Sequence, residues 1–190
     1  MKKALVLVFC GILALVSLTG CFSGTATTGT SPSVHQTSTT VKREVWEMNY
    51  YIDEFRQPTN KWYVSNRNNF VGTFSNSATD NSQLNVILAV DAEKVTFILY
   101  EYGNSKVKNI FSKRQNYTIV MQDVGGTRYE MRGYIPSQGD RLILTDSYRQ
   151  TVINALKQNG TISFYIYDSD YTITKYWFKA ETGNFKDLIR

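Results

Sequence analysis

Apolar and polar residues alternate in short runs along most of the chain after residue 44, and Gly, Asn, Asp or Pro separates one run from the next. This period of two is typical of strands that bury one face. Residues 84–90 and 95–99 are the clearest example, and residues 91–93 between them predict a hairpin turn. Further turns are expected at residues 124–126 and 168–170. The other alternating or β-rich runs are residues 45–51, 61–64, 69–74, 116–122, 127–135, 141–145, 161–167 and 171–178.

One stretch departs from this period. Residues 147–159 carry apolar residues at helical spacing, with Asp146 or Ser147 able to cap the start and Gly160 placed to end the helix. The apolar residues concerned are Val152, Ile153 and Leu156. A second, short helical turn is expected at residues 185–189. Many short strands with one helix predict a mainly β fold, either an antiparallel β-sandwich or a partly open β-barrel.

The start of the chain has a different character. Residues 4–18 form an apolar run behind a basic start, which fits a signal peptide and is shorter than the ~20 residues of a spanning helix. The sequence LTGC at residues 18–21 resembles a bacterial lipobox, which implies that the Cys21 thiol takes a diacylglyceryl group and that residues 1–20 are removed. The alternative is an ordinary secretory leader, which would leave Cys21 unpaired because Cys10 lies inside the leader.

Lipidation would make a membrane the first partner of this protein. Each buried methylene of an acyl chain contributes about 0.8 kcal/mol, so the several chains of a processed lipoprotein anchor it stably. Residues 21–40 are rich in Ser and Thr and predict a flexible tether, in which His35 has no fixed partners. Residues 41–190 are then a single β-rich domain in the cell envelope. Phe22 takes the place of the aspartate that many inner-membrane lipoproteins carry, which favours the outer membrane in a Gram-negative host.

Composition excludes several classes of function. The chain has 21 basic and 16 acidic residues, and loss of the leader with its lysines leaves only a slight positive balance. The densest basic stretch is spread around Ile110 and Phe111, which favours a solvated hairpin edge over nucleic-acid binding. Its residues are Lys106, Lys108, Lys113 and Arg114. No Gly-rich phosphate loop, CxxC or HExxH spacing is present, so we expect neither a cofactor nor a metal.

Three short motifs resemble a set of bacterial proteins to which no activity is assigned. Residues 50–63 read YYIDEFRQPTNKWY, residues 72–84 read GTFSNSATDNSQL, and residues 101–103 read EYG. The related proteins often read YxxDEFGxPTxxKY and GxFSNSATxxSxL, with an EYG further on. Where that pattern prefers glycine after the phenylalanine, this chain has Arg56. The resemblance covers most of the domain and implies no activity.

Two of these motifs contain candidate site residues. Asp53 and Glu54 are adjacent carboxylates that could act in acid–base chemistry or bind calcium, whereas in a turn Asp53 would accept hydrogen bonds from backbone amides. Asn76 lies in residues 75–82, where hydroxyl and amide groups are dense. Such a segment either satisfies its own backbone in an irregular loop or offers donors to a sugar or peptide. The domain has no histidine, so a Ser–His nucleophile is not expected.

Aromatic residues are the remaining candidates. In the run at residues 161–167, Tyr165 and Tyr167 lie on the face opposite Ile162, Phe164 and Ile166. Exposed aromatic rows stack on sugar rings or contact a partner protein, and they also form ordinary cross-strand pairs.

Three hypotheses about function follow. The first is a non-catalytic, lipid-anchored domain that binds an envelope protein, peptide or glycan. Its candidate contacts are Tyr165, Tyr167, Asn76 and Asp53. The second is a hydrolase acting through Asp53, Glu54 or Glu101, which needs at least two of these carboxylates to converge. The third is a structural or assembly subunit without a small ligand.

Overall fold

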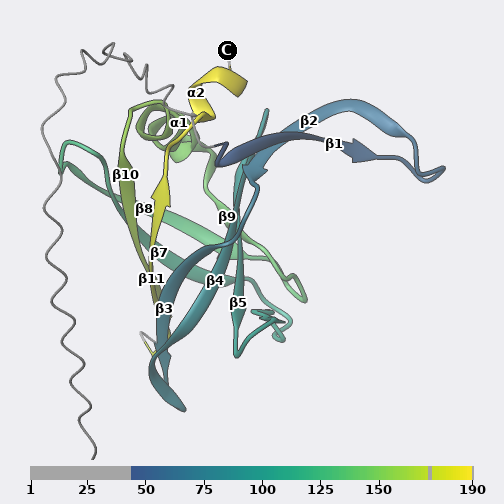
Figure 1. Ribbon diagram of the computed structural model, residues 1–190. Helices are drawn as coiled ribbons and strands as arrows, with labels where there is room; N and C mark the ends of the chain where they lie inside the picture. Colours follow the sequence, from purple (N-terminus) through teal and green to yellow (C-terminus); the bar gives the residue numbers. More distant parts are fainter. Residues whose placement is uncertain (1–43, 171–172, 190) are drawn as a thin grey trace, which may run out of the picture. The chain divides into compact units, whose positions relative to one another are not determined.

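Antiparallel strands dominate the computed structural model, which describes residues 44–170 and 173–189 (Figure 1). These residues belong to one compact unit, Thr40–Arg190. The predicted leader, Cys21 and the tether lie outside the described residues, as does the predicted start of the last strand at Tyr171. The strands are β1 (Trp46–Ile52), β2 (Pro58–Asn66), β3 (Phe70–Asn76), β4 (Thr79–Asp91), β5 (Val95–Glu101), β6 (Ser105–Lys106), β7 (Gln115–Gln122), β8 (Arg128–Ile135), β9 (Leu142–Leu144), β10 (Thr161–Asp168) and β11 (Lys175–Glu181).

Eight of these strands close into an antiparallel barrel. The order around it is β4-β3-β11-β10-β7-β8-β9-β5, and β5 pairs again with β4. The prediction of a mainly β, antiparallel fold is therefore confirmed, and the barrel is closed rather than partly open. Closure removes every free edge from these strands, which protects them from pairing with another chain.

The barrel interior is filled by side chains from alternate positions of each strand. At its centre the rings of Phe97, Phe164 and Phe178 contact one another, with Phe164 stacked on Phe178 at a centroid distance of 4.9 Å. The inward residues predicted for the hairpin at residues 84–99 are also buried. A small barrel packed in this way has no room for a ligand, so any binding surface has to lie outside it.

Helices cover one end of the barrel (Figure 1). They are η1 (Asp146–Tyr148), α1 (Arg149–Leu156) and α2 (Phe185–Leu188). The helix expected at residues 147–159 is present but shorter, and the predicted caps are wrong, because Tyr148 is its N-cap residue and forms no side-chain cap. Burial of its apolar face, which includes Val152 and Leu156, takes the place of capping. Within the described residues no helix is long and apolar enough to cross a bilayer.

The β1–β2 hairpin, called the arm below, leaves the barrel and projects from it (Figure 1). Its root is β2, of which only Tyr63, Val64 and Ser65 pair with β4. Beside them the side-chain Nδ2 of Asn66 donates to the Val86 carbonyl at 3.1 Å, and its Oδ1 accepts from the Leu88 backbone amide at 2.7 Å. The Asn66 side chain thus supplies hydrogen bonds to β4 at the point where β4 stops pairing with β3 and starts pairing with β2.

The C-terminal helix holds the other strand of the arm. The Asn184 side-chain oxygen accepts hydrogen bonds from the Val45 and Trp46 amides at 3.0 and 2.9 Å. The Trp46 ring packs edge-on against Phe70 and Phe185. The root of the arm is therefore fixed to the barrel, and only its outer part stands free.

Candidate functional site

Tyr165 and Tyr167 lie on the outer surface of the barrel, as their position opposite the apolar face predicts. Tyr165 stacks on Trp177 of the neighbouring strand at 5.1 Å and contacts Tyr167 at 5.3 Å. We call these three side chains the aromatic platform. A hollow of about 310 Å³ beside Trp177 is lined in part by Thr73 and Lys179. The platform thus offers flat rings next to polar groups, although sequence analysis did not single out Trp177.

Asn76 has a structural role at the turn between β3 and β4. Its side-chain oxygen accepts from the Ala78 and Thr79 amides at 2.9 and 3.2 Å, and its amide donates to the Tyr102 hydroxyl at 3.1 Å. The expectation of an irregular loop at residues 75–82 is wrong, because strand pairing runs through most of it. The hydroxyl and amide groups of this segment bond mainly to one another.

Asp53 organises the turn at the tip of the arm. One carboxylate oxygen accepts from the Phe55 and Gln57 amides at 2.9 and 2.8 Å, and the Asp53 amide donates to the Gln57 carbonyl. Arg56 in this turn has φ 61°, the left-handed region that glycine adopts most easily. This backbone conformation is compatible with the expected resemblance, in which glycine occupies that position.

The carboxylates named for a hydrolase do not form a converging pair. Asp53 and Glu54 are at the tip of the arm, between the end of β1 at Ile52 and the start of β2 at Pro58. Glu101 ends β5, roughly 20 Å along that strand from Val95 at ~3.3 Å per residue, and accepts from the Tyr176 hydroxyl at 2.9 Å. Burial raises the pKa of Glu101, and the Tyr176 hydrogen bond opposes that rise. The Glu101 carboxyl group therefore lies far from Asp53 and Glu54, beside Tyr176 at the opposite end of β5 from the arm.

A concave surface lies between the arm and the barrel, and sequence analysis did not find it. The arm, β4 and β5 form one continuous sheet, whose outer face bends where the arm leaves the barrel. Two hollows, of about 330 and 610 Å³, adjoin there and are called the arm cleft. Residues lining the first include Tyr51, Tyr63, Ser65, Ile87, Ala89, Thr96, Ile98 and Arg141, and the second adds Lys61, Trp62, Glu93 and Lys94.

Tyr51 and Asp91 line both hollows and fix their shape. The Tyr51 hydroxyl donates to one Asp91 oxygen at 2.7 Å, and the other oxygen accepts from the Glu93 and Lys94 amides at 2.8 Å each. Burial and the Asp91 carboxylate together raise the pKa of Tyr51 to about 12. The hydroxyl therefore keeps its proton at neutral pH, and both Asp91 oxygens are occupied by structural hydrogen bonds.

Aromatic and apolar groups dominate the surface of the first hollow. The Tyr51 and Tyr63 rings contact each other at 5.0 Å, facing Ile87 and Ile98 of the barrel. Arg141 is the basic side chain on this hollow. Among the described residues no group of three His, Cys, Asp or Glu side chains could hold a metal ion. The arrangement offers aromatic contacts and a few hydrogen-bonding groups to a ligand.

The sequence contained a signal for this cleft. Tyr51, Trp62 and Tyr63 all fall within residues 50–63, the stretch expected to resemble other bacterial proteins, although only Tyr63 matches a specified position of that pattern. Placing Tyr51 beside Tyr63 requires the register of the hairpin, in which Asn49 pairs with Tyr63 and Tyr50 with Trp62. Placing both opposite β5 requires the long-range pairing of β2 with β4.

Comparisons with known proteins add no assignment. No protein-family model, curated protein or solved structure matches the chain. The resemblance to a set of bacterial proteins stays a prediction, and function has to be argued from the surfaces described above.

Proposed function

We propose that this chain is a lipid-anchored envelope protein whose non-catalytic barrel binds an extended peptide segment of another envelope protein in the arm cleft. The observation that carries the proposal is the cleft itself, a concave and largely apolar surface with three tyrosines, Tyr50, Tyr51 and Tyr63, on a barrel whose interior is full. Ligand sites are typically concave, apolar surfaces with a few convergent polar groups.

An extended peptide fits this cleft for two reasons. First, β1 is an edge strand of the sheet. Among residues 44–170 and 173–189 no strand pairs with its outer side, where an added strand could pair. Second, Tyr51 and Tyr63 present broad rings with polar ends, the kind of side chain enriched where proteins contact each other. Ser65, Thr96 and Arg141 supply hydrogen-bonding groups for the peptide backbone.

The way in which the polar groups of the cleft are used supports a non-catalytic role. Asp91 accepts three hydrogen bonds through its side chain, and its carbonyl accepts from the Arg149 guanidinium at 2.6 and 3.0 Å. A general base needs a free acceptor aimed at the substrate. Asp91 instead fixes the arm, the β4–β5 turn and α1 relative to one another.

Peptide binding is tested with the chain from residue 22 onward, which keeps the whole unit Thr40–Arg190 and lacks Cys21. Peptides are selected from a random library, and their affinity is measured by calorimetry. Tyr63→Ala is expected to weaken binding about 10-fold or more, because a truncated aromatic contact costs over 1 kcal/mol. Trp177→Ala, on the aromatic platform, is the control and should leave the affinity unchanged.

Selection of no peptide above background would count against the cleft as a binding site. So would equal affinity of wild-type protein and Tyr63→Ala, provided that thermal unfolding shows both to be folded. If intact envelopes nevertheless retain the protein through its barrel, an assembly role without a linear ligand is the better account.

The lipid anchor is a separate part of the proposal. It rests on the LTGC sequence at residues 18–21. Cells grown with radiolabelled palmitate should label the wild-type protein and leave Cys21→Ser unlabelled. A wild-type protein that carries no label and is released into the supernatant would exclude the anchor without bearing on the cleft.

The aromatic platform favours a glycan as a second candidate ligand. Tyr165 and Trp177 lie nearly parallel, at 20°, on the convex outside of the barrel, where a sugar ring has access. A glycan array probed with wild-type protein and Trp177→Ala tests this candidate, with Tyr63→Ala as the control. Loss of glycan signal in Trp177→Ala alone would assign sugar binding to the platform.

A further inference from the structure

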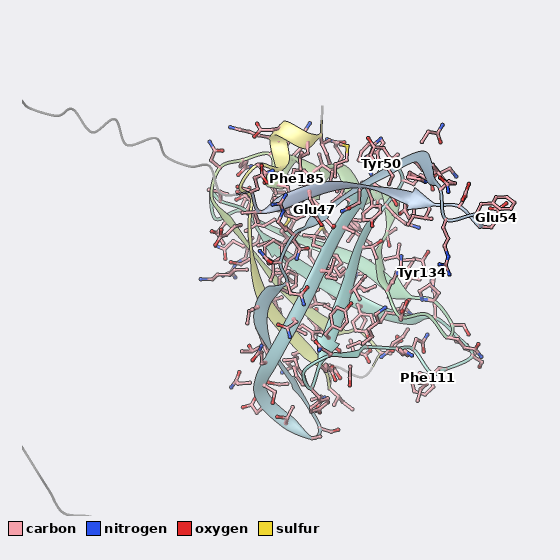
Figure 2. All side chains as sticks on the ribbon, turned by 45° about the vertical axis from the view of Figure 1, so that its right-hand side comes forward. Glu47, Tyr50, Glu54, Phe111, Tyr134 and Phe185 are labelled. Atoms are coloured by element: carbon pink, nitrogen blue, oxygen red, sulfur yellow. The ribbon has the colours of Figure 1, made fainter. Side chains whose placement is uncertain are left out.

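Residues 107–114, which connect β6 to β7 and are called the tip loop, place two apolar side chains in solvent. Ile110 is 81% exposed and Phe111 is 52% exposed. Figure 2 shows Phe111 at the end of this loop, away from the barrel wall. Exposing adjacent large apolar side chains is unfavourable in water, so the arrangement indicates a surface that becomes covered.

The backbone of the tip loop is held in place by hydrogen bonds, although Ile110 and Phe111 are exposed. Asn109, between them and the barrel, is 1% exposed. Its amide donates to the carbonyls of Lys113, Ile135 and Pro136 at 2.7, 3.1 and 3.1 Å, and its oxygen accepts from the Phe111 amide at 2.9 Å. A single buried side chain thus ties the loop backbone to the end of β8. Because the loop is already ordered, binding through it costs little conformational entropy.

Basic side chains surround the apolar pair. Lys108, Lys113 and Arg114 are exposed and form no salt bridge with the described residues. Lys106 pairs with Asp140 at 3.3 Å, and Asp170 lies near Lys113 and Arg114. The tip loop therefore combines an apolar apex with a net positive surround.

We infer that the tip loop docks on the surface of a lipid bilayer with anionic headgroups, inserting Ile110 and Phe111 at the level of the headgroups. Charge complementarity is the first argument, since each Lys or Arg near an anionic leaflet adds to binding. Shape is the second. A stable protein partner needs about 800 Å² of contact surface on each side, whereas the apex is small and convex. A bilayer accepts such an apex at its interface.

The outline of the molecule allows a flat surface to approach the loop. The arm tip, with Ile52 and Phe55 exposed, projects on the same side as the tip loop in both views (Figures 1 and 2). Neither Cys21 acylation nor peptide binding in the arm cleft is required for contact between the tip loop and a bilayer, so the inference can fail or hold independently of both.

The test uses the chain from residue 22 onward, which contains no cysteine. Vesicles of equal parts phosphatidylcholine and phosphatidylglycerol are compared with vesicles of phosphatidylcholine alone, by co-sedimentation at low and high salt. We expect binding to the anionic vesicles that weakens with salt, because the basic surround is exposed and screened. Replacing Ile110 and Phe111 together by Ser should weaken it about 10-fold or more, and Lys113→Gln about fivefold.

The matched control replaces Val71 and Val124 by Ser, which removes two exposed apolar side chains from β3 and from the β7–β8 turn, away from the tip loop. It should bind vesicles like the wild type. A second measurement places a polarity-sensitive fluorophore on Ile110→Cys or on Val71→Cys. The emission of the loop label should shift to the blue with anionic vesicles, and that of the Val71→Cys label should not.

Each result decides the inference. Salt-sensitive binding with a blue shift at position 110 supports it. An absence of binding to anionic vesicles overturns it, as does binding that the Ser variants leave intact or that produces no shift at position 110. Equal binding to both kinds of vesicle overturns the role of the basic residues.

Discussion

The barrel and the arm are built from the same kind of alternating strand but place their apolar side chains differently. Every strand of the barrel pairs on both sides, and the inward side chains contact one another across the core. In the arm, β1 pairs on one side only within the part of the chain that the structure describes, and Met48, Tyr50 and Ile52 stay exposed. The comparison indicates that the barrel provides stability and that the arm provides contact surface.

The largest difference between the barrel and the arm is expected when one large side chain is removed from each region. Phe164→Ala leaves a cavity against Phe97 and Phe178 and should lower the free energy of unfolding by about 3–5 kcal/mol. Tyr50→Ala on the arm should change it by no more than about 0.5 kcal/mol. Urea denaturation of both variants measures the difference. Similar losses for the two would show that the arm is part of the core.

A smaller effect is expected at the junction between the two regions. Asn184→Ala removes the acceptor for the Val45 and Trp46 amides and should cost about 1–3 kcal/mol, the penalty for unsatisfied backbone donors. Asn154→Ala is the control, because Asn154 forms only an exposed hydrogen bond with Gln150. Hydrogen exchange of the Trp46 amide should quicken in Asn184→Ala alone. Unchanged exchange would mean that β2 by itself holds the arm.

The Glu101 carboxyl group, at the opposite end of β5 from the arm, should show a weaker, pH-dependent effect. Burial raises the pKa of Glu101 in the folded protein, so its contribution to stability is complete below pH 4.5 and is lost as pH rises through the folded-state value. Glu101→Gln keeps an acceptor for the Tyr176 hydroxyl and cannot ionise. The stability of the wild type relative to Glu101→Gln should therefore fall as pH rises above 4.5, in urea titrations at several pH values. A relative stability that rises with pH would reverse the assignment.

The smallest change is expected at the arm tip. Arg56→Gly relieves a non-glycine residue at φ 61° and should raise stability by roughly 0.5–1 kcal/mol. Glu54→Gly in the same turn is the control. Since Glu54 is not in the left-handed region, glycine there only adds freedom to the unfolded chain and should lower stability slightly. Equal responses of the two variants would show that the left-handed conformation at Arg56 does not favour glycine.

Much of the fold could be predicted because strand faces depend on local alternation. Leu84, Val86 and Phe97 are buried as their positions predict, and Tyr165 lies on the opposite face from Phe164. Helix length was less predictable, since the helix at residues 149–156 is fixed by the barrel end that it covers rather than by caps. The roles of Asn76 and Asp53 in turns were among the alternatives that the sequence left open.

The candidate site was mostly hidden from the sequence. Tyr63 lines the arm cleft because β2 pairs with β4. Ile98 lines it because β5 pairs with the opposite edge of β4. Arg141 arrives from the connection between β8 and β9. The basic residues around Ile110 were expected to lie on a hairpin edge. Lys106 does so in β6, whereas Lys108, Lys113 and Arg114 belong to a loop held by Asn109.

The sequence by itself determined the β class, the inward and outward faces of the strands, and the lipobox-like start, because each of these is written in the order of neighbouring residues. Only the tertiary structure decided that the barrel closes, that the arm stands out from it, and that the tip loop exposes Ile110. These features depend on which strands far apart in the sequence pair, and on which side chains stay exposed after that pairing. Local sequence patterns predict neither.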